Sequence, residues 1–175
     1  MNLKGSSCFE NGIFKIKGSG YFLQPNADVW NCVCKKFNKD FEFIVKINLV
    51  FAPSRESCAG ILLKENLEQE GKYLTAIVYS INFLGTSLTW KNENTALTNM
   101  RRFNPNGGHI KVVKKSNKVT LFISEYGKNW EEVYSSNSIF KSDTLYICLT
   151  TSSREPNRLS LAEFEVTNSA LTIPD

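Results

Sequence analysis

Two of the three tryptophans are the side chains best suited to hold a ligand. Trp30 follows Asn26 and Asp28 in a polar stretch, and Trp90 ends the segment SLTW. An indole face stacks on the apolar face of a sugar ring, and the ring itself is rigid. We therefore expect both tryptophans to bind a ligand, with packing in the core or at a rim as the alternative.

The third tryptophan lies in a different setting, the segment SEYGKNW of residues 124–130. Alternating segments flank it on both sides, and Gly127 can adopt the left-handed backbone conformation of a short hairpin loop. Trp130 begins the returning strand. We predict that it anchors the hairpin and does not bind a ligand.

Four polar or aromatic side chains alternate with apolar residues and could line the floor of a sheet: Lys64, Tyr79, Trp90 and Arg102. Two cations and aromatic faces suit a hydroxyl-rich or acidic glycan better than an apolar ligand. A solvated strand face is the alternative for each.

His109, the only histidine, follows two glycines and is a further ligand-binding candidate at a rim. It has no nearby Ser or Cys nucleophile to activate, so we also consider a structural role.

Glycosidase chemistry requires two carboxylates about 5–9 Å apart across a cleft. Only Glu163 and Glu165 alternate on one segment, LAEFEV. We expect them to face solvent, opposite Ala162, Phe164 and Val166. Phosphate-binding glycine loops, HExxH segments and nucleophile elbows are absent from the sequence. A glycoside hydrolase is therefore the less favoured interpretation, and no catalytic residue is predicted.

The five cysteines are odd in number and scattered: Cys8, Cys32, Cys34, Cys58 and Cys148. One residue separates Cys32 from Cys34, whereas zinc knuckles and redox motifs have two. A single histidine supplies a Cys/His zinc site poorly. We predict reduced, mostly buried thiols and no bound metal.

Length and charge limit the classes of protein to consider. A chain of 175 residues is predicted to form one domain, 1–175. The net charge of +4 comes with only short basic clusters, so a nucleic-acid partner is not expected. The sequence contains no stretch of about 18 apolar residues, so no membrane span is predicted, and no secretory leader is visible. We expect a cytoplasmic protein.

Alternation with a period of two dominates the chain. In residues 41–51, FEFIVKINLVF, every second residue from Phe41 to Phe51 is apolar, which predicts a half-buried strand. The same pattern recurs in residues 12–17, 59–64, 73–80, 109–115, 118–124, 145–151 and 159–166. Turn-forming residues separate about eleven or twelve such segments, and no amphipathic helix of about ten residues is present.

So many strands must be protected from edge-to-edge pairing. Two sheets packed face to face achieve this around a shared apolar core. The chain is too long for a sandwich of the immunoglobulin type, which has about 100 residues. The sequence therefore predicts an all-β, antiparallel two-sheet jelly-roll sandwich.

The order of several landmarks carries a family resemblance. These are NADVWNC, CAGILLKEN, SLTWK, SEYGKNW and LAEFEV, in that order. The chain resembles the concanavalin A-like lectin/glucanase superfamily over residues 12–167, and more narrowly its DUF1349-like jelly-roll group. The resemblance implies that Trp130 packs against the sandwich and that the Trp90 strand crosses a concave, sugar-binding sheet.

Three positions depart from the pattern of that group. Lys64 stands where arginine is usual, Tyr126 where the hairpin has aspartate, and Glu165 where some relatives have aspartate. The glucanases of this fold also carry an acidic strand motif that this chain lacks. The resemblance also allows calcium, which occurs in the superfamily, but the sequence shows no acidic cluster that would hold it. No cofactor is predicted.

These observations lead to one functional expectation with an alternative. We expect a non-catalytic, lectin-like module that binds carbohydrate or a glycosylated partner on a concave sheet, through Trp30, Lys64, Tyr79, Trp90, Arg102 and His109. The alternative is a protein–protein interaction or metabolic-regulatory module of the same fold.

Overall fold

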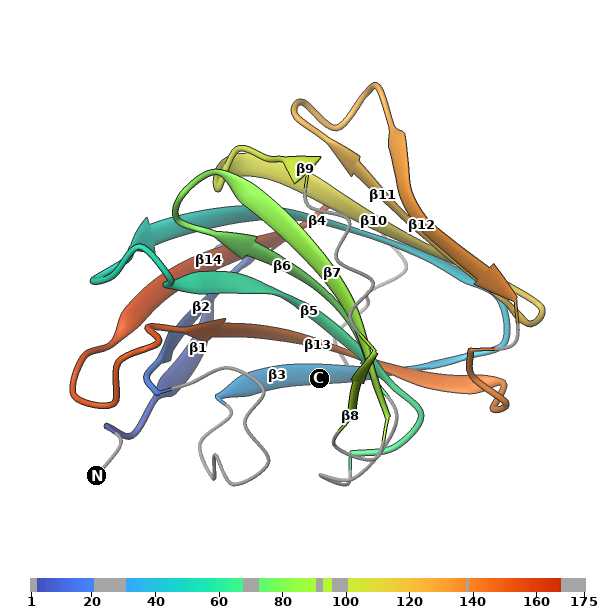
Figure 1. The fold of residues 1–175 in the computed structure, drawn as a ribbon, viewed down its shortest axis with the longest axis horizontal. Helices are drawn as coiled ribbons and strands as arrows, with labels where there is room; N and C mark the ends of the chain where they lie inside the picture. Colours follow the sequence, from blue (N-terminus) through green and yellow to red (C-terminus); the bar gives the residue numbers. More distant parts are fainter. Residues whose placement is uncertain are drawn as a thin grey trace.

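The structure, a computed structural model, describes residues 3–20, 31–67, 73–90, 93–95, 101–137 and 139–167. The side chains of residues 85–90 and 93–95 lie outside this description. Fourteen β-strands form in the described part of the chain, and none of it is helical. Figure 1 shows the strands as two stacked, curved layers.

The first layer, sheet A, is antiparallel. Its strands are, in spatial order, β1 (Ser6–Glu10), β2 (Ile13–Gly18), β14 (Ser160–Val166), β4 (Phe41–Phe51), β10 (Asn106–Lys115), β11 (Lys118–Ser124) and β12 (Glu131–Asn137).

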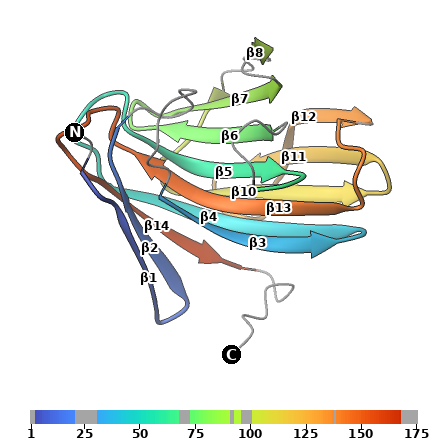
Figure 2. The same ribbon diagram turned by 90° about the horizontal axis from the view of Figure 1, so that it is seen from below.

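The second layer, sheet B, is antiparallel too. In spatial order it contains β3 (Cys32–Asn38), β13 (Thr144–Ser152), β5 (Cys58–Lys64), β6 (Tyr73–Tyr79), β7 (Phe83–Trp90) and β8 (Glu93–Thr95), and the short β9 (Arg101–Arg102) also pairs with β7. Figure 2 looks onto this sheet, with β13 between β3 and β5. The predicted all-β, antiparallel two-sheet jelly-roll sandwich is confirmed.

The core lies between the two sheets and is built by alternation. Sheet A contributes Phe43, Val45 and Ile47 of β4, and sheet B contributes Ile61 and Leu63 of β5. All are at most 2% exposed. Each side chain of this size contributes about 1.5–3 kcal/mol on full burial. The alternating sequence therefore fixes which face of each strand turns inward.

The burial of residues in two strands, β4 and β5, differs from the prediction. Phe51 was grouped with the core face of β4, yet it is 53% exposed. The register between β14 and β4 shifts between Leu161 and Ala162, and this irregularity takes the end of β4 out of the alternation. Strand β5 was expected to be half-buried, but all its residues are buried because it lies centrally between β13 and β6.

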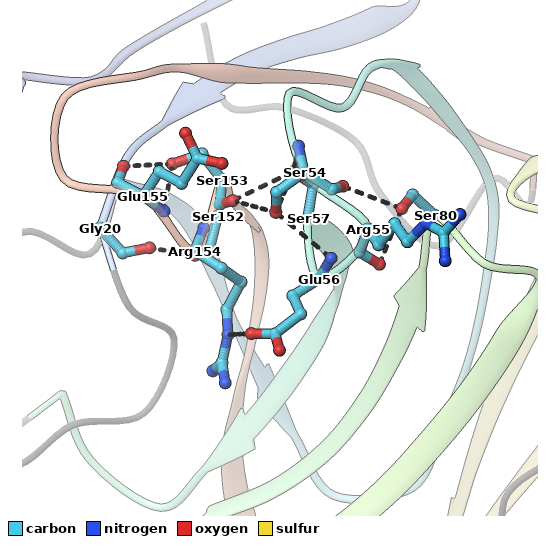
Figure 3. Close-up of polar contacts among 10 residues, drawn as sticks. All are labelled: Gly20, Ser54, Arg55, Glu56, Ser57, Ser80, Ser152, Ser153, Arg154 and Glu155. Atoms are coloured by element: carbon cyan, nitrogen blue, oxygen red, sulfur yellow. Dashed lines mark hydrogen bonds and ion pairs between the residues drawn. The ribbon is translucent and has the colours of Figure 1, made fainter.

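Serine hydroxyls join the β4–β5 and β13–β14 loops at one end of the sandwich (Figure 3). Ser54 and Ser57 both donate to the carbonyl of Ser153, at 2.9 and 3.1 Å. Ser80 donates to the carbonyls of Ser54 and Arg55, at 3.0 and 2.9 Å. These bonds satisfy loop groups that would otherwise be buried without partners, so the network is structural.

No segment among the described residues forms a helix long and apolar enough to cross a membrane.

Candidate functional site

The outer face of sheet B, turned away from sheet A, carries two of the predicted site residues. Lys64 of β5 pairs in register with Tyr146 of β13 and with Tyr73 of β6. Tyr79 lies at the other end of β6, opposite Cys58. Burial raises the pKa of the half-buried Tyr79 above its usual value. Lys64 and Tyr79 therefore share a face but lie at opposite ends of the strand pair.

The middle of this outer face is closed to solvent. Leu62 is fully buried, Cys148 is 1% exposed and Ile77 is 2% exposed, and they pack together as a small apolar cluster separate from the main core. Lys64 itself is only 7% exposed. Among the described side chains, the middle of this face therefore offers no open polar floor for a saccharide, and the half-buried Tyr79 and Tyr146 lie at its margins.

The cysteines of this face differ from the prediction of reduced thiols. Cys34 and Cys148 form a disulfide, because antiparallel pairing of β3 and β13 places them directly opposite each other. Cys32, two residues earlier on the same face, is free and lies 3.6 Å from the sulfur of Cys34. Burial raises the pKa of the Cys32 thiol. The prediction was correct for Cys58, which is free and fully buried.

A second candidate lies at the edge of the sandwich, which we call the edge cleft. It has a volume of about 740 Å³ and is lined by residues of the β6–β7 turn, β7, β9, the β9–β10 connection, β11 and the β11–β12 hairpin. Figure 1 shows β9 and the β11–β12 hairpin along the same edge. The polar lining is Asn82, Arg102, Asn104, Ser124, Glu125, Asn129 and Glu131, and the apolar and aromatic lining is Ile81, Phe83, Phe103 and Ile123. The volume falls within the range of small-molecule sites.

Backbone hydrogen bonds hold the sheet B side of the edge cleft in place. Asn82 adopts a left-handed φ of 64° in the turn that joins β6 to β7. Its carbonyl accepts a hydrogen bond from the backbone of Phe103 at 3.0 Å. The Asn104 side chain accepts from the backbone of Asn106 at 2.9 Å. Because these loops are tied down, the cleft is largely preformed.

The charges in the edge cleft are mixed. Arg101, next to the cleft, pairs with Glu131 at 3.2 Å, so this carboxylate has a cationic partner. Arg102 is exposed and lines the cleft. Asn129 is exposed on the hairpin loop, where Gly127 adopts the predicted left-handed φ of 72°. The cleft thus presents one cation, the two carboxylates of Glu125 and Glu131, and amide groups together.

His109 supports the hairpin and does not line the edge cleft. It lies on β10 opposite Ser124, and a Cβ at Gly127 would come within 3.1 Å of its ring. Burial and the nearby Lys46 ammonium lower the pKa of His109. Its Nδ1 atom is buried without a hydrogen-bond partner. Whether His109 also binds a ligand stays a prediction.

The two carboxylates of β14 lie on the outer face of sheet A, as predicted, since Ala162 and Phe164 are fully buried on the opposite face. Glu165 pairs with Lys46 at 3.6 Å, and Glu163 accepts a hydrogen bond from Asn48 at 3.4 Å.

One group of side chains among the described residues could hold a metal ion. Among them, three or more potential metal-ligating side chains come close together in one group, Cys32, Cys34 and Cys148. Calcium prefers six to eight oxygen ligands, and this group offers none.

The two predicted tryptophans contribute little to this description. Trp30 lies outside the described residues. Trp90 ends β7, where its backbone pairs with Glu93, and its side chain lies outside the description. Of the six predicted residues, Arg102 lines the edge cleft, Lys64 and Tyr79 share the outer face of sheet B, and His109 lies in sheet A. The four of these residues whose side chains the structure describes lie apart from one another, and the shared site stays a prediction.

Sequence reasoning missed most of the edge cleft. Asn82, Phe83, Glu125 and Asn129 were not proposed as binding residues. The turn formers around Asn104 and the hairpin loop near Gly127 were recognised, but only as connections. Recurring amides and carboxylates in such turns were the available signal.

Comparison with solved structures identifies the fold. The chain is similar to a functionally unknown protein from Saccharomyces cerevisiae, with 16% identity, coverage of 98% of this chain and 96% of that one, and a TM-score of 0.72. It is also similar to the GH43 protein BlXynB from Bacillus licheniformis, with 16% identity and a TM-score of 0.70. That match covers 90% of this chain but only 32% of the BlXynB chain, so this chain corresponds to about a third of that protein.

The carbohydrate-binding module CBM66 from Bacillus subtilis is similar as well, with 9% identity, coverage of 95% of this chain and 92% of the module, and a TM-score of 0.62. No protein-family model and no curated protein matches the sequence. The chain therefore has a concanavalin A-like sandwich fold, which it shares with carbohydrate-binding and glycoside-hydrolase proteins.

Proposed function

We propose that this protein binds carbohydrate without catalysis, at the edge cleft. One observation carries the proposal: the cleft combines the aromatic ring of Phe83, the guanidinium of Arg102 and the amides of Asn82, Asn104 and Asn129. The similarity to a carbohydrate-binding module supports it at the level of the fold. Membership of the DUF1349-like group remains part of the proposal.

The chemistry of the lining matches that of a sugar. Hydroxyl groups donate and accept hydrogen bonds, and amide side chains can do both. Arg102 adds charge-assisted donors for a hydroxyl or a carboxylate of an acidic sugar. The ring of Phe83 offers an apolar surface for the C–H face of a pyranose. Together these groups recognise a ligand that is polar at its edge and apolar on its face.

The location differs from the concave-sheet expectation for a physical reason. The closed apolar cluster around Leu62 and Ile77 occupies the middle of the outer face of sheet B. At the edge cleft, by contrast, Arg102, Asn104 and Asn129 are exposed.

Calorimetric titration tests the proposal after a glycan array has selected candidate saccharides. A shallow, preformed cleft should give dissociation constants of about 10 μM to 1 mM, or about 4–7 kcal/mol. Arg102→Ala and Asn129→Ala should each weaken binding by about tenfold, the equivalent of one lost hydrogen bond to a charged or polar group. Arg158→Ala is the matched control, because Arg158 is also exposed but lies outside the cleft, paired with Glu155. Absence of binding to every saccharide, or equal binding by all variants, would contradict the proposal.

A protein-interaction module remains the second candidate, because apolar side chains are exposed at the cleft. Ile81 lines it and is 47% exposed, and Tyr126, 76% exposed, lies next to Glu125 on the hairpin. A protein partner that binds the wild type but not Ile81→Ser would favour this function, provided that the wild type binds no saccharide.

A hydrolase is the least supported alternative. Turnover of chromogenic glycosides that disappears with Glu125→Gln would establish it.

A further inference from the structure

We propose that Cys32, Cys34 and Cys148, after reduction of the disulfide, form a three-thiolate site for a soft, closed-shell metal ion of the Cu(I) class. This site is separate from the edge cleft and does not depend on the carbohydrate proposal.

The positions of the three sulfurs carry the inference. All three lie within 4.8 Å of one another, and the Cys32 and Cys34 sulfurs are 3.6 Å apart. Three thiolates bound to one ion at about 2.3 Å, in a plane, would be about 4 Å apart. Rotation of the Cys34 and Cys148 side chains out of the disulfide can open that spacing. In the oxidised chain the disulfide forms one side of this triangle of sulfurs, and only the triangle opened by reduction would suit a shared ion at its centre.

Backbone pairing explains why three cysteines converge. Cys32 and Cys34 are two residues apart on β3, so both side chains are on the same face. Cys148 lies directly opposite Cys34 on β13, and Cys32 lies opposite Thr150. Strand β13 is held on its other side by β5. The sheet therefore keeps the triangle together when the disulfide is reduced.

The surroundings select the class of metal. No histidine or carboxylate belongs to the group, and sulfur ligands favour soft ions over calcium or magnesium. Leu62 and Ile77 pack in the same apolar cluster and keep bulk water away. Lys64, only 7% exposed, pairs with Tyr146, two residues before Cys148 on the same face, and its ammonium would offset the negative charge of three thiolates. Cys32 and Cys34 are only half-buried, so an ion can reach them from solvent.

The two states of the site exclude each other. A dithiol or phosphine reductant supplies two electrons, the Cys34–Cys148 bond breaks, and each sulfur takes up one proton. Binding of one Cu(I) then displaces the protons of the three thiols and forms three metal–sulfur bonds. In the oxidised chain two of the three sulfurs are already bonded to each other, so the site is not available.

Competition titration tests the proposal. The full chain is reduced, freed of reductant without oxygen, and titrated with Cu(I) against the chromophoric chelator bicinchoninate. We expect the reduced wild type to withdraw one copper per chain, and the oxidised chain to withdraw at least tenfold less at the same chelator concentration. X-ray absorption should show three sulfur neighbours at about 2.3 Å.

Matched variants identify the ligands. Cys32→Ser should weaken Cu(I) binding by at least tenfold and leave only two sulfur neighbours, while the disulfide can still form. Cys8→Ser is the control, because Cys8 is a free and exposed cysteine on another sheet. Copper retention by Cys32→Ser equal to that of wild type would overturn the proposal. So would a reduced chain that keeps its β-sheet circular dichroism but withdraws no copper, or one that unfolds on reduction.

Discussion

The ammonium of Lys111 lies 4.4 Å from the ring centre of Trp130. It also lies 4.8 Å from the ring centre of Phe122, so one cation contacts two aromatic rings from neighbouring segments. Trp130 is half-buried by this arrangement, directly after the hairpin loop. This contact agrees with the predicted hairpin anchor, and the role itself stays a prediction. The residues on either side of it, Asn129 and Glu131, line the edge cleft.

Removal of the ring should therefore weaken the fold more than the loss of a surface residue would. Trp130→Ala is expected to destabilise the protein by about 1–3 kcal/mol, because a half-buried ring loses part of its buried area. A double-mutant cycle with Lys111→Ala should give a coupling of about 0.5–1 kcal/mol. Urea denaturation followed by circular dichroism measures both. Additive effects of the two substitutions would show that the cation–ring contact contributes nothing.

Two glycines should differ in their tolerance of alanine. A Cβ at Gly60 would lie 2.1 Å from the backbone carbonyl oxygen of Ala76, an obstacle that cannot move without shifting β6. At Gly127 the nearest atoms belong to the side chain of His109, 3.1 Å away, and the φ of 72° adds strain. We expect Gly60→Ala to cost about 3 kcal/mol or more and Gly127→Ala about 1 kcal/mol. Equal denaturation midpoints for the two variants would contradict this order.

Stability should decrease on mild acidification because of His109. Its folded-state pKa is lowered, first by burial and then by Lys46, so the unfolded chain binds the proton more readily. The stabilising contribution is complete above the ordinary pKa of 6.5 and is lost as the pH falls below it. His109→Asn should reduce the loss of stability between about pH 7.5 and about pH 5.5. NMR titration of the only imidazole in the chain measures the pKa directly, and a value above 6.5 would refute the prediction.

The free thiols should react at widely different rates. Cys8 is exposed, whereas complete burial raises the pKa of Cys58 to about 12. Only the thiolate is nucleophilic, so Cys58 should be alkylated only when the chain unfolds. Timed alkylation with peptide mass spectrometry distinguishes the two, and the same digest reveals the Cys34–Cys148 disulfide. Rapid labelling of Cys58 in the folded protein would mean that its strand is accessible.

The serine network should contribute measurably to stability. Ser57 is fully buried, accepts a hydrogen bond from the backbone of Ser54 at 3.0 Å and donates to the carbonyl of Ser153. Ser57→Ala leaves the Ser54 N–H without this acceptor and should cost about 1–3 kcal/mol. Ser7→Ala, at an exposed position on β1, is the control and should be nearly neutral. A similar thermal shift for both variants would argue against the network.

The two-sheet architecture could be predicted from the residue pattern within each segment. Alternation in residues 41–51 identified the core face of β4 through Phe43, Val45 and Ile47, and turn formers marked the strand ends. The error at Phe51 arose because a register shift depends on the partner strand, β14, which is more than a hundred residues away. The alternation of residues within one segment does not show where the register against a partner strand shifts.

The site was less predictable because it depends on pairing between distant segments. Cys34 and Cys148 are separated by 114 residues, and only the register of β3 against β13 brings them together. Arg102 and Asn129 meet at the edge cleft for the same kind of reason. A candidate list drawn from residue types found Arg102 but not its neighbours.

Strand β1 has a consequence for the dynamics of sheet A. It pairs with β2 along its whole length, yet all five of its residues are exposed, so little buried area beyond the contact of Phe9 with Phe14 supports its backbone bonds. Local opening is easiest where few apolar contacts must be broken. The amides of β1 should therefore exchange with deuterium long before those of β4, and the outermost ladder of the sandwich can separate while the rest stays closed.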